Sequence, residues 1–139
     1  MQPHTVVVFG VFDLLHPGHV FFLEQASKYG ELHVIVTLDV IVRMLKNKTP
    51  NQDENVRLQQ VQELPYVKKT YLCDTELGSY QILRNINPDI ICIGYDQYFL
   101  CQHLQEKMKD PSFPQAKIVH IESFHAELYS TTILSNKSI

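Results

Sequence analysis

The chain has 139 residues, of which 45% are hydrophobic. This length suits one domain with a full core and leaves little room for a second, so we expect residues 1–139 to form a single domain. The net charge of −3 at pH 7 excludes a broad basic field for nucleic acid, and any anion site should therefore be local.

Short apolar runs alternate with helix-like segments along the chain, which is the pattern of a parallel sheet with crossover helices. Strands are expected at Val6–Phe9, Leu32–Thr37, Lys69–Cys73, Ile90–Ile93 and Lys117–Ile121. Helices are expected at about His19–Tyr29, Val40–Leu45, Asp53–Glu63, Tyr80–Asn85 and Tyr98–Lys109. Right-handed crossovers then predict an α/β fold, a doubly wound (Rossmann-like) parallel five-stranded sheet with helices on both faces.

Ligands of such sheets bind beyond the carboxyl ends of the strands, at a switch point in strand order. Three segments follow the first, fourth and fifth expected strands: Gly10–Gly18, Gly94–Tyr98 and Ser123–Thr132. We expect these segments to share one cleft.

Two histidines surround a glycine where the first strand gives way to the first helix. At a helix start, unpaired backbone N–H groups and the helix dipole favour an anion beside Gly18. Imidazolium donors at His16 and His19 would add to that attraction. The alternative is that His19 is a first-turn residue hydrogen-bonded to backbone and His16 an ordinary loop residue.

The run from Gly10 to His19 resembles the G-x-F-D-x-x-H-x-G-H signature of the cytidylyltransferase-like nucleotidyltransferases. Near the other end, Tyr129–Ile133 is similar to the family's I-S-T/S-T/S-x-I segment. The resemblance implies an enzyme that transfers a nucleoside monophosphate from a nucleoside triphosphate (NTP) to a phosphorylated acceptor and releases pyrophosphate.

In that reaction, charge builds on the phosphate oxygens and the protein needs to do little covalent chemistry. His16 and His19 are therefore expected to stabilise the transition state rather than to act as nucleophiles. The resemblance also implies that the first loop touches the nucleotide, although Asp13 has the alternative of a turn or cap residue. The nucleotide-binding residues expected here are Gly10, Val11, Phe12, Asp13 and Gly18.

Basic side chains follow in and after a loop rich in helix-breaking residues. Lys46 and Lys48 would ordinarily be a solvated pair, but the resemblance implies that this segment reaches the substrate and triphosphate, with Lys46 the favoured phosphate ligand. Arg57 matches a family arginine that projects toward the phosphates. Its alternative is an i, i+4 pair with Asp53 on a helix surface.

The segment after the fourth strand carries candidate nucleotide contacts. Gly94 allows close approach of a ligand, and Asp96 and Gln97 could read a base or ribose; the alternative is a turn capped by Asp96. The run Gly94-Tyr95-Asp96-Gln97 looks like the G-Y-D/N-Q of archaeal-type FAD synthetases, whereas glycerol-3-phosphate cytidylyltransferases typically show G-D-D-W. It favours ATP and FMN as substrates, with CTP and glycerol 3-phosphate or a related polyol phosphate as the alternative.

Ser130, Thr131 and Thr132 can donate hydroxyl and N–H groups at a helical turn, which predicts a binding site for β- or γ-phosphate oxygens; the alternative is an ordinary Ser/Thr N-cap. Just upstream the chain departs from the family, with residues near His125 and at Leu128 where a basic residue and a glycine are usual. The departures keep open a third hypothesis, a nucleotide-binding module without turnover.

Seven histidines and three cysteines show no spacing typical of structural zinc, so no metal ligand is assigned to the protein. We expect Mg²⁺ to arrive with the NTP. The cysteines have neither disulfide parity nor C-x-x-C spacing, and the N-terminus lacks a basic and apolar leader, which together favour reduced thiols, a cytoplasmic location and no membrane partner.

The resemblance implies a homodimer, because small members of the family are commonly dimers. Phe21, Phe22, Tyr66 and Tyr71 exceed what one helix face needs to bury and could line such an interface. The alternative is that they complete the core of the monomer.

Overall fold

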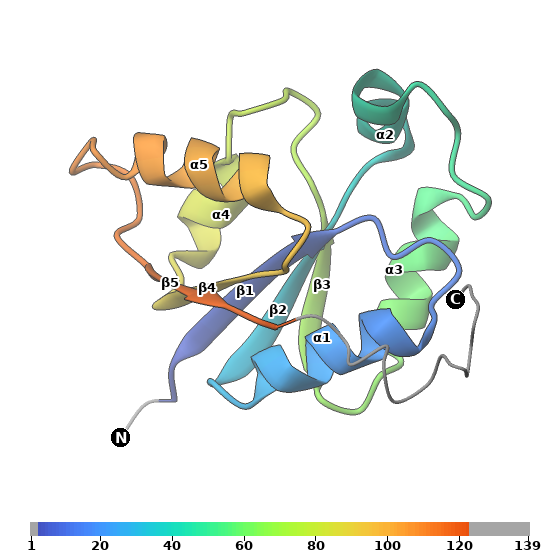
Figure 1. Cartoon of the computed structure of the whole chain (residues 1–139), viewed down its shortest axis with the longest axis horizontal. Coiled ribbons are helices and arrows are strands. Elements are labelled where there is room, and N and C mark those ends of the chain that lie inside the picture. The colour runs from blue at the N-terminus through green and yellow to red at the C-terminus, as the bar shows by residue number, and fades with distance from the viewer. Residues whose placement is uncertain (1–2, 123–139) are drawn as a thin grey trace.

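The computed structural model describes residues 3–122 (Figure 1). Its elements are β1 (Thr5–Gly10), α1 (Pro17–Ser27), β2 (Glu31–Val36), α2 (Asp39–Lys46), α3 (Glu54–Gln62), β3 (Val67–Leu72), α4 (Gln81–Ile86), β4 (Ile90–Ile93), α5 (Tyr98–Lys107) and β5 (Lys117–His120). Every helix and strand expected from the sequence is present. The ends differ from the expected ones by two residues at most.

The five strands form one parallel sheet in the order β3-β2-β1-β4-β5. The chain first builds outward from β1 to β2 and β3, and then returns to the other side of β1 for β4 and β5. This reversal places a switch point between β1 and β4, whose following loops diverge and leave room for a ligand. The predicted fold class is confirmed.

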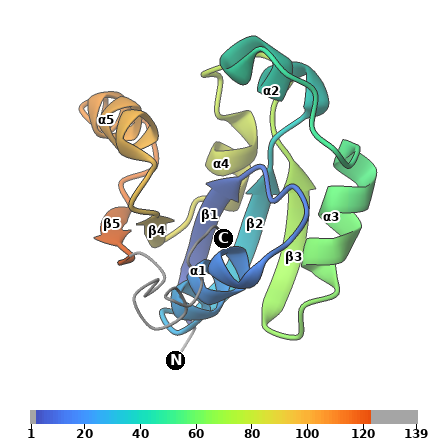
Figure 2. The same ribbon diagram turned by 45° about the vertical axis from the view of Figure 1, so that its right-hand side comes forward.

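The side chains of β1 alternate between two cores because successive residues of a strand point to opposite faces. Val6 and Val8 lie in a cluster with buried residues of α1 and α3, whereas Val7 lies in a cluster with α4 and α5. The helices therefore cover both faces of the sheet, and α2 lies past the carboxyl ends of the strands (Figure 2).

Four aromatic residues considered for an interface pack within the monomer. Phe21, Phe22 and Tyr66 lie against the α1/α3 cluster and Tyr71 against the α4/α5 cluster, all partly buried. These aromatic side chains therefore contribute to the two cores, which agrees with the alternative that they complete the core of the monomer.

The three cysteines, all within the described residues, are free thiols, and Cys92 and Cys101 are buried. Burial raises the pKa of the Cys92 thiol to about 12, which keeps it protonated and unreactive. None of the helices in residues 3–122 combines the length and the apolar character needed to span a bilayer.

Candidate active site

A cavity of about 870 Å³ opens at the switch point. The loops after β1 and β4 line it together, and Ile121 and Glu122, directly after β5, reach it as well. The expected site residues along its wall are Gly10, Val11, Phe12, Asp13, His16, Gly18, His19, Lys46, Lys48, Gly94, Asp96 and Gln97. Ser130, Thr131 and Thr132, like the departures at His125 and Leu128, lie outside the described residues.

His16 and His19 together form the N-terminal cap of α1. The His16 Nδ1 accepts hydrogen bonds from the backbone N–H groups of Gly18 at 3.1 Å and His19 at 3.4 Å, and the His19 Nδ1 accepts from the backbone of His16 at 3.3 Å. This is a capping box, in which imidazoles stand where Ser or Thr and Glu or Gln are usual. The helix begins at Pro17, two residues before the expected start, because proline suits the first helical position.

The capping bonds decide which nitrogen of each ring carries the proton. Since Nδ1 of both rings accepts, each neutral imidazole holds its proton on Nε2. The two rings stack with centroids 3.7 Å apart, and within the described residues neither Nε2 has a hydrogen-bond partner. The backbone-bonded alternative and the donor role are thus compatible: Nδ1 serves the helix and Nε2–H remains for a ligand.

His19 is neutral at neutral pH. Burial, followed by the neighbouring His16, lowers the pKa of His19 to about 4, although Asp96 and Asp13 oppose the shift. The edge contact with the buried ring of Phe12, at a centroid distance of 5.6 Å, contributes to that burial. The expectation of an imidazolium at His19 was made for a site that holds a polyphosphate, whereas this low pKa belongs to the protein without one.

The low pKa of His19 makes stability depend on pH. In the unfolded chain His19 has the ordinary pKa of 6.5, so between pH 6.5 and about pH 4 it binds a proton that it does not bind in the folded protein. The His19 ring therefore does not lower the free energy of unfolding above pH 6.5, but it lowers it increasingly as the pH falls from 6.5 toward 4. We expect the free energy of unfolding, measured with urea, to fall by about 2 kcal/mol across that range, because solvent screening reduces the full effect of the pKa difference. His19→Gln is the control, and an unchanged pH dependence in that variant would contradict this origin.

Gly18 leaves the space that the His16 ring occupies. A Cβ atom on Gly18 would lie 2.9 Å from the His16 Cε1, which is too close for an undisturbed contact. Since the ring is the end of a movable side chain, Gly18→Ala should displace the imidazole without unfolding the helix. We expect turnover to fall about tenfold while the melting temperature stays within a few degrees. Steady-state kinetics and thermal unfolding check this, and unchanged turnover would show that the ring position is unimportant.

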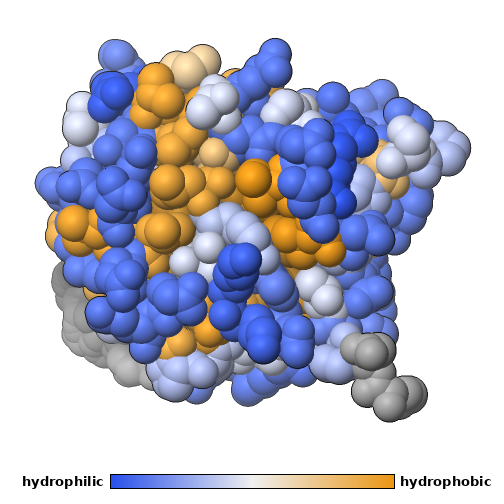
Figure 3. All heavy atoms as spheres, turned by 180° about the vertical axis from the view of Figure 1, so that it is seen from behind, coloured by the Kyte–Doolittle hydropathy of each residue, from blue (hydrophilic) through white to orange (hydrophobic). Residues whose placement is uncertain are grey.

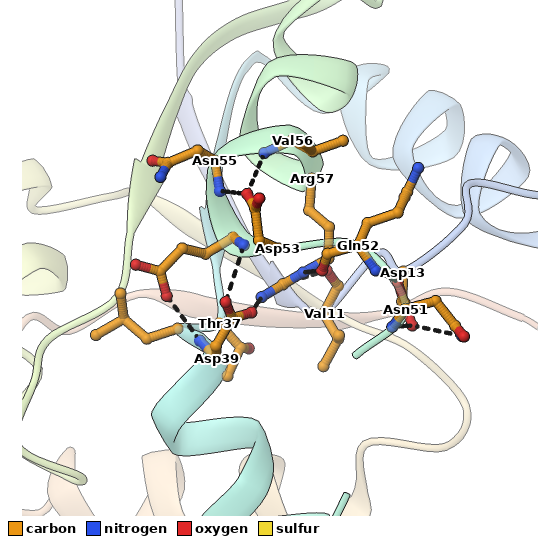
Figure 4. A network of polar contacts seen from close by, with 12 residues as sticks. Val11, Asp13, Thr37, Asp39, Asn51, Gln52, Asp53, Asn55, Val56 and Arg57 are labelled. Carbon is orange, nitrogen blue, oxygen red and sulfur yellow. Dashed lines mark hydrogen bonds and ion pairs between the residues drawn. The ribbon is translucent and has the colours of Figure 1, made fainter. Parts of the chain in front are cut away.

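Asp13 bonds across the molecule rather than within its own turn. Its carboxylate accepts hydrogen bonds from Asn51 N at 2.8 Å, Asn51 Nδ2 at 3.1 Å and Gln52 N at 2.9 Å (Figure 4). Burial works against ionisation, but these bonds outweigh it and hold the pKa of Asp13 below its ordinary value. Both oxygens accept bonds from the loop between α2 and α3, so Asp13 is not a local cap, and its contact with a nucleotide stays a prediction.

Arg57 is fully buried at 0% exposure and does not line the cavity. Its Nε donates to the carbonyl of Gln52 at 2.9 Å, its Nη1 to the carbonyl of Val11 at 2.8 Å, and its Nη2 pairs with Asp39 (Figure 4). Asp53, the alternative partner, instead caps α3. Both sequence interpretations of Arg57 are corrected, because the interior offers it three acceptors from three different segments.

The segment after β4 divides its polar groups between structure and cavity. The Gln97 amide accepts from Gly94 N and donates to the Phe9 carbonyl, both at 2.8 Å, and thus ties the end of β4 to the end of β1. Asp96 does not cap α5, and its exposed carboxylate accepts no hydrogen bond from residues 3–122. The Asp96 carboxylate therefore remains available to a ligand.

Lys46 and Lys48 are exposed at the cavity rim. Lys46 closes the last turn of α2, and Asn47 ends the helix in the left-handed conformation, which turns the chain toward Pro50. The ammonium of Lys46 lies near enough to His19 to disfavour its protonation. The structure therefore brings Lys46 and the paired imidazoles to one wall.

A doubly wound parallel sheet with imidazole donors and lysines at its switch point defines a protein that acts on a phosphorylated nucleotide. Residues 7–137 match the family described as cytidylyltransferase-like. The chain is 43% identical over 105 residues to an FAD synthase of Thermococcus onnurineus, covering 75% of this chain and 70% of that one. It is 39% identical over 132 residues to an FAD synthase of Methanothermobacter thermautotrophicus, covering 91% and 85%.

Solved structures agree with these sequence matches. A crystal structure from Thermoplasma volcanium, described as a lipopolysaccharide core biosynthesis protein, superposes with a TM-score of 0.80 at 36% identity and covers 88% of this chain and 99% of that one. Pantothenate synthetase from Thermus thermophilus shares the fold, with a TM-score of 0.59 at 12% identity, covering 91% and 62%. The chain belongs to the cytidylyltransferase-like family and is a nucleotidyltransferase.

Proposed function

We propose that this protein is an FMN adenylyltransferase, which joins the AMP group of ATP to the phosphate of FMN and releases FAD and pyrophosphate. The observation that carries the proposal is the likeness to FAD synthases, at 36–43% identity over 75–91% of the chain. The runner-up is a cytidylyltransferase that uses CTP and glycerol 3-phosphate or a related polyol phosphate.

The shape of the cavity supports a large apolar acceptor. Beyond the polar wall, α2 and the region from β3 to α4 contribute apolar side chains to its lining, namely Ile41, Val42, Leu45, Leu77 and Ile82. The molecule seen from behind shows a band of apolar side chains between polar ones (Figure 3). A flavin ring would bury such a wall from water, whereas glycerol 3-phosphate has almost no apolar surface to offer.

The chemistry assigns a role to each group at the polar wall. An FMN phosphate oxygen forms a bond to the α-phosphorus of ATP while the bond from that phosphorus to the bridging oxygen breaks, and this oxygen leaves with pyrophosphate. His16 and His19 would donate Nε2–H to oxygens that gain charge, and Lys46 would bind the triphosphate. Gly10, Gly18 and Gly94 would let the nucleotide approach the backbone closely.

A divalent cation fits this site as a companion of the triphosphate. Residues 3–122 contain no group of three or more His, Cys, Asp or Glu side chains that could hold a metal ion. The unpartnered carboxylate of Asp96 suits a metal held mainly by phosphate oxygens and water. We propose that this cation is Mg²⁺, which neutralises charge on the phosphates when bound.

The proposal is tested by assaying the purified protein with each combination of ATP or CTP and FMN or glycerol 3-phosphate. Pyrophosphate and the joined product are measured. We expect ATP with FMN to exceed every other pair by about a hundredfold in kcat/KM. A preference for CTP with glycerol 3-phosphate would favour the runner-up. Tight nucleotide binding without pyrophosphate from any pair would favour the module without turnover.

Leu45 and Met44 give a matched test of the apolar wall. Both are on α2 with similar exposure, 60% and 63%, but only Leu45 lines the cavity. Leu45→Ser should raise the KM for FMN about fivefold and leave the KM for ATP unchanged, because apolar burial against the ring is lost. Met44→Ser should change neither constant, and equal effects of the two substitutions would contradict the assignment.

We also propose that the chain forms a homodimer. The support is the family resemblance together with large apolar side chains exposed at the start of α5, where Tyr98 is 64% and Phe99 is 82% exposed. Sedimentation at high protein concentration tests the proposal, and a sharp monomer boundary would overturn it.

A further inference from the structure

Two loops that are far apart in the sequence hold each other through the side chains of Asp13 and Gln52. Asp13 accepts from the backbone N–H of Gln52, and the Gln52 Oε1 in turn accepts from the backbone N–H of Leu14 at 2.9 Å. Asn51 adds its backbone and side-chain donors to the same carboxylate (Figure 4). We call this reciprocal set of bonds the Asp13–Gln52 bridge.

The bridge acts on a loop that does not hold its conformation by local preference. Phe12 and Leu14 both have a φ of 54°, in the left-handed region that bulky residues rarely adopt. Such a conformation persists only where surrounding contacts determine it. The bond from Leu14 N to Gln52, together with the bond from Arg57 to the Val11 carbonyl, supplies contacts of that kind.

Both loops that the bridge joins also carry donors of the polar wall. His16 follows Leu14 by two residues, and Lys48 precedes Asn51 by three, so each loop carries its own donors to the cavity. The Lys46–Pro50 segment begins at the last residue of α2, whereas the loop that leads to His16 follows β1, so the sheet reaches these donors only through intervening residues. What joins them directly is the set of bonds between the two loops.

We propose that Asp13 and Gln52 are positioning residues for the reaction: they hold the Lys46–Pro50 segment at the distance from His16 and His19 at which one triphosphate meets both. Neither side chain needs to touch the nucleotide. The proposal rests on the phosphate role given to Lys46 under the proposed function, and not on the identity of the acceptor.

The test is a double-mutant cycle between Gln52→Leu and Lys46→Ala. Gln52→Leu removes the acceptor of the Leu14 N–H, and we expect it to raise the KM for the NTP about tenfold while the acceptor KM stays within twofold. In the Lys46→Ala background, the same change should raise the NTP KM less than twofold, because the lysine it positions is absent. Its effect on the melting temperature should be equal in both backgrounds.

Gln59→Leu is the control, since Gln59 is an exposed residue of α3 that does not line the cavity. Asp13→Asn should reproduce the pattern of Gln52→Leu. Independent, multiplying effects of Gln52→Leu and Lys46→Ala would overturn the proposal, as would Asp13→Asn impairing NTP binding while Gln52→Leu does not. Calorimetric binding of ATP and of CTP to the same variants, measured without acceptor, keeps the test valid whichever nucleotide and acceptor the enzyme uses.

Discussion

Replacing His16 or His19 by alanine is expected to lower turnover by about a hundredfold or more, while the affinity for the NTP changes far less. The reason is that the Nε2–H donors would meet phosphate oxygens whose charge grows only in the transition state. Single-turnover rates and direct binding of ATP separate the two quantities. Folded variants with nearly normal turnover would remove these residues from the catalytic centre.

Alanine also deletes the cap of α1, so the donor role needs a variant that keeps the helix start. Asparagine is among the best N-cap residues and glutamine is usual at the third position of a capping box. His16→Asn and His19→Gln should therefore restore the melting temperature toward that of the unmodified protein and still recover little turnover. Recovered turnover in these variants would mean that capping, rather than an imidazole donor, is what the reaction needs.

Replacing Arg57 by methionine is expected to reduce the free energy of unfolding by about 3–5 kcal/mol. Methionine fills much of the volume, but it leaves the Asp39 carboxylate and the carbonyls of Val11 and Gln52 without their buried donor. Urea unfolding measures the loss. A decrease below about 1 kcal/mol would show that these acceptors find other partners.

Arg43→Met provides the matched control for Arg57→Met. Arg43 is an exposed residue of α2 without an ion pair in the described part of the chain, so the control should change stability by no more than about 0.5 kcal/mol. If both substitutions destabilised the protein equally, loss of positive charge rather than loss of the buried bonds would be the cause.

The elements and their order could be predicted from the sequence because their signals are local. Val6, Val7 and Val8 form a β-branched run typical of a strand buried on both faces, and helical segments between such runs are typical of a parallel sheet. The position of the cleft followed from that topology. Both histidines were expected near the start of the first helix, but their mutual cap was not, because the expected helix began at His19 rather than at Pro17.

The directions of several polar side chains could not be predicted, because their partners are remote in the sequence. Arg57 was expected at the phosphates and Asp13 at the nucleotide or its own turn, but their acceptors and donors lie 38 to 46 residues away for Asp13–Asn51 and Arg57–Val11. Gln97 likewise reaches across to the carbonyl of Phe9. No local pattern encodes such contacts.

What the sequence determined by itself is therefore the secondary structure, the sheet and the edge at which the histidines and lysines gather, because backbone propensity and hydrophobic periodicity act over a few residues. What only the tertiary structure decided is the lowered pKa of His19 and the use of Asp13, Gln97 and Arg57 in internal hydrogen bonds. Burial and remote partners set these properties, since a buried polar group must take whichever donors and acceptors packing brings within reach.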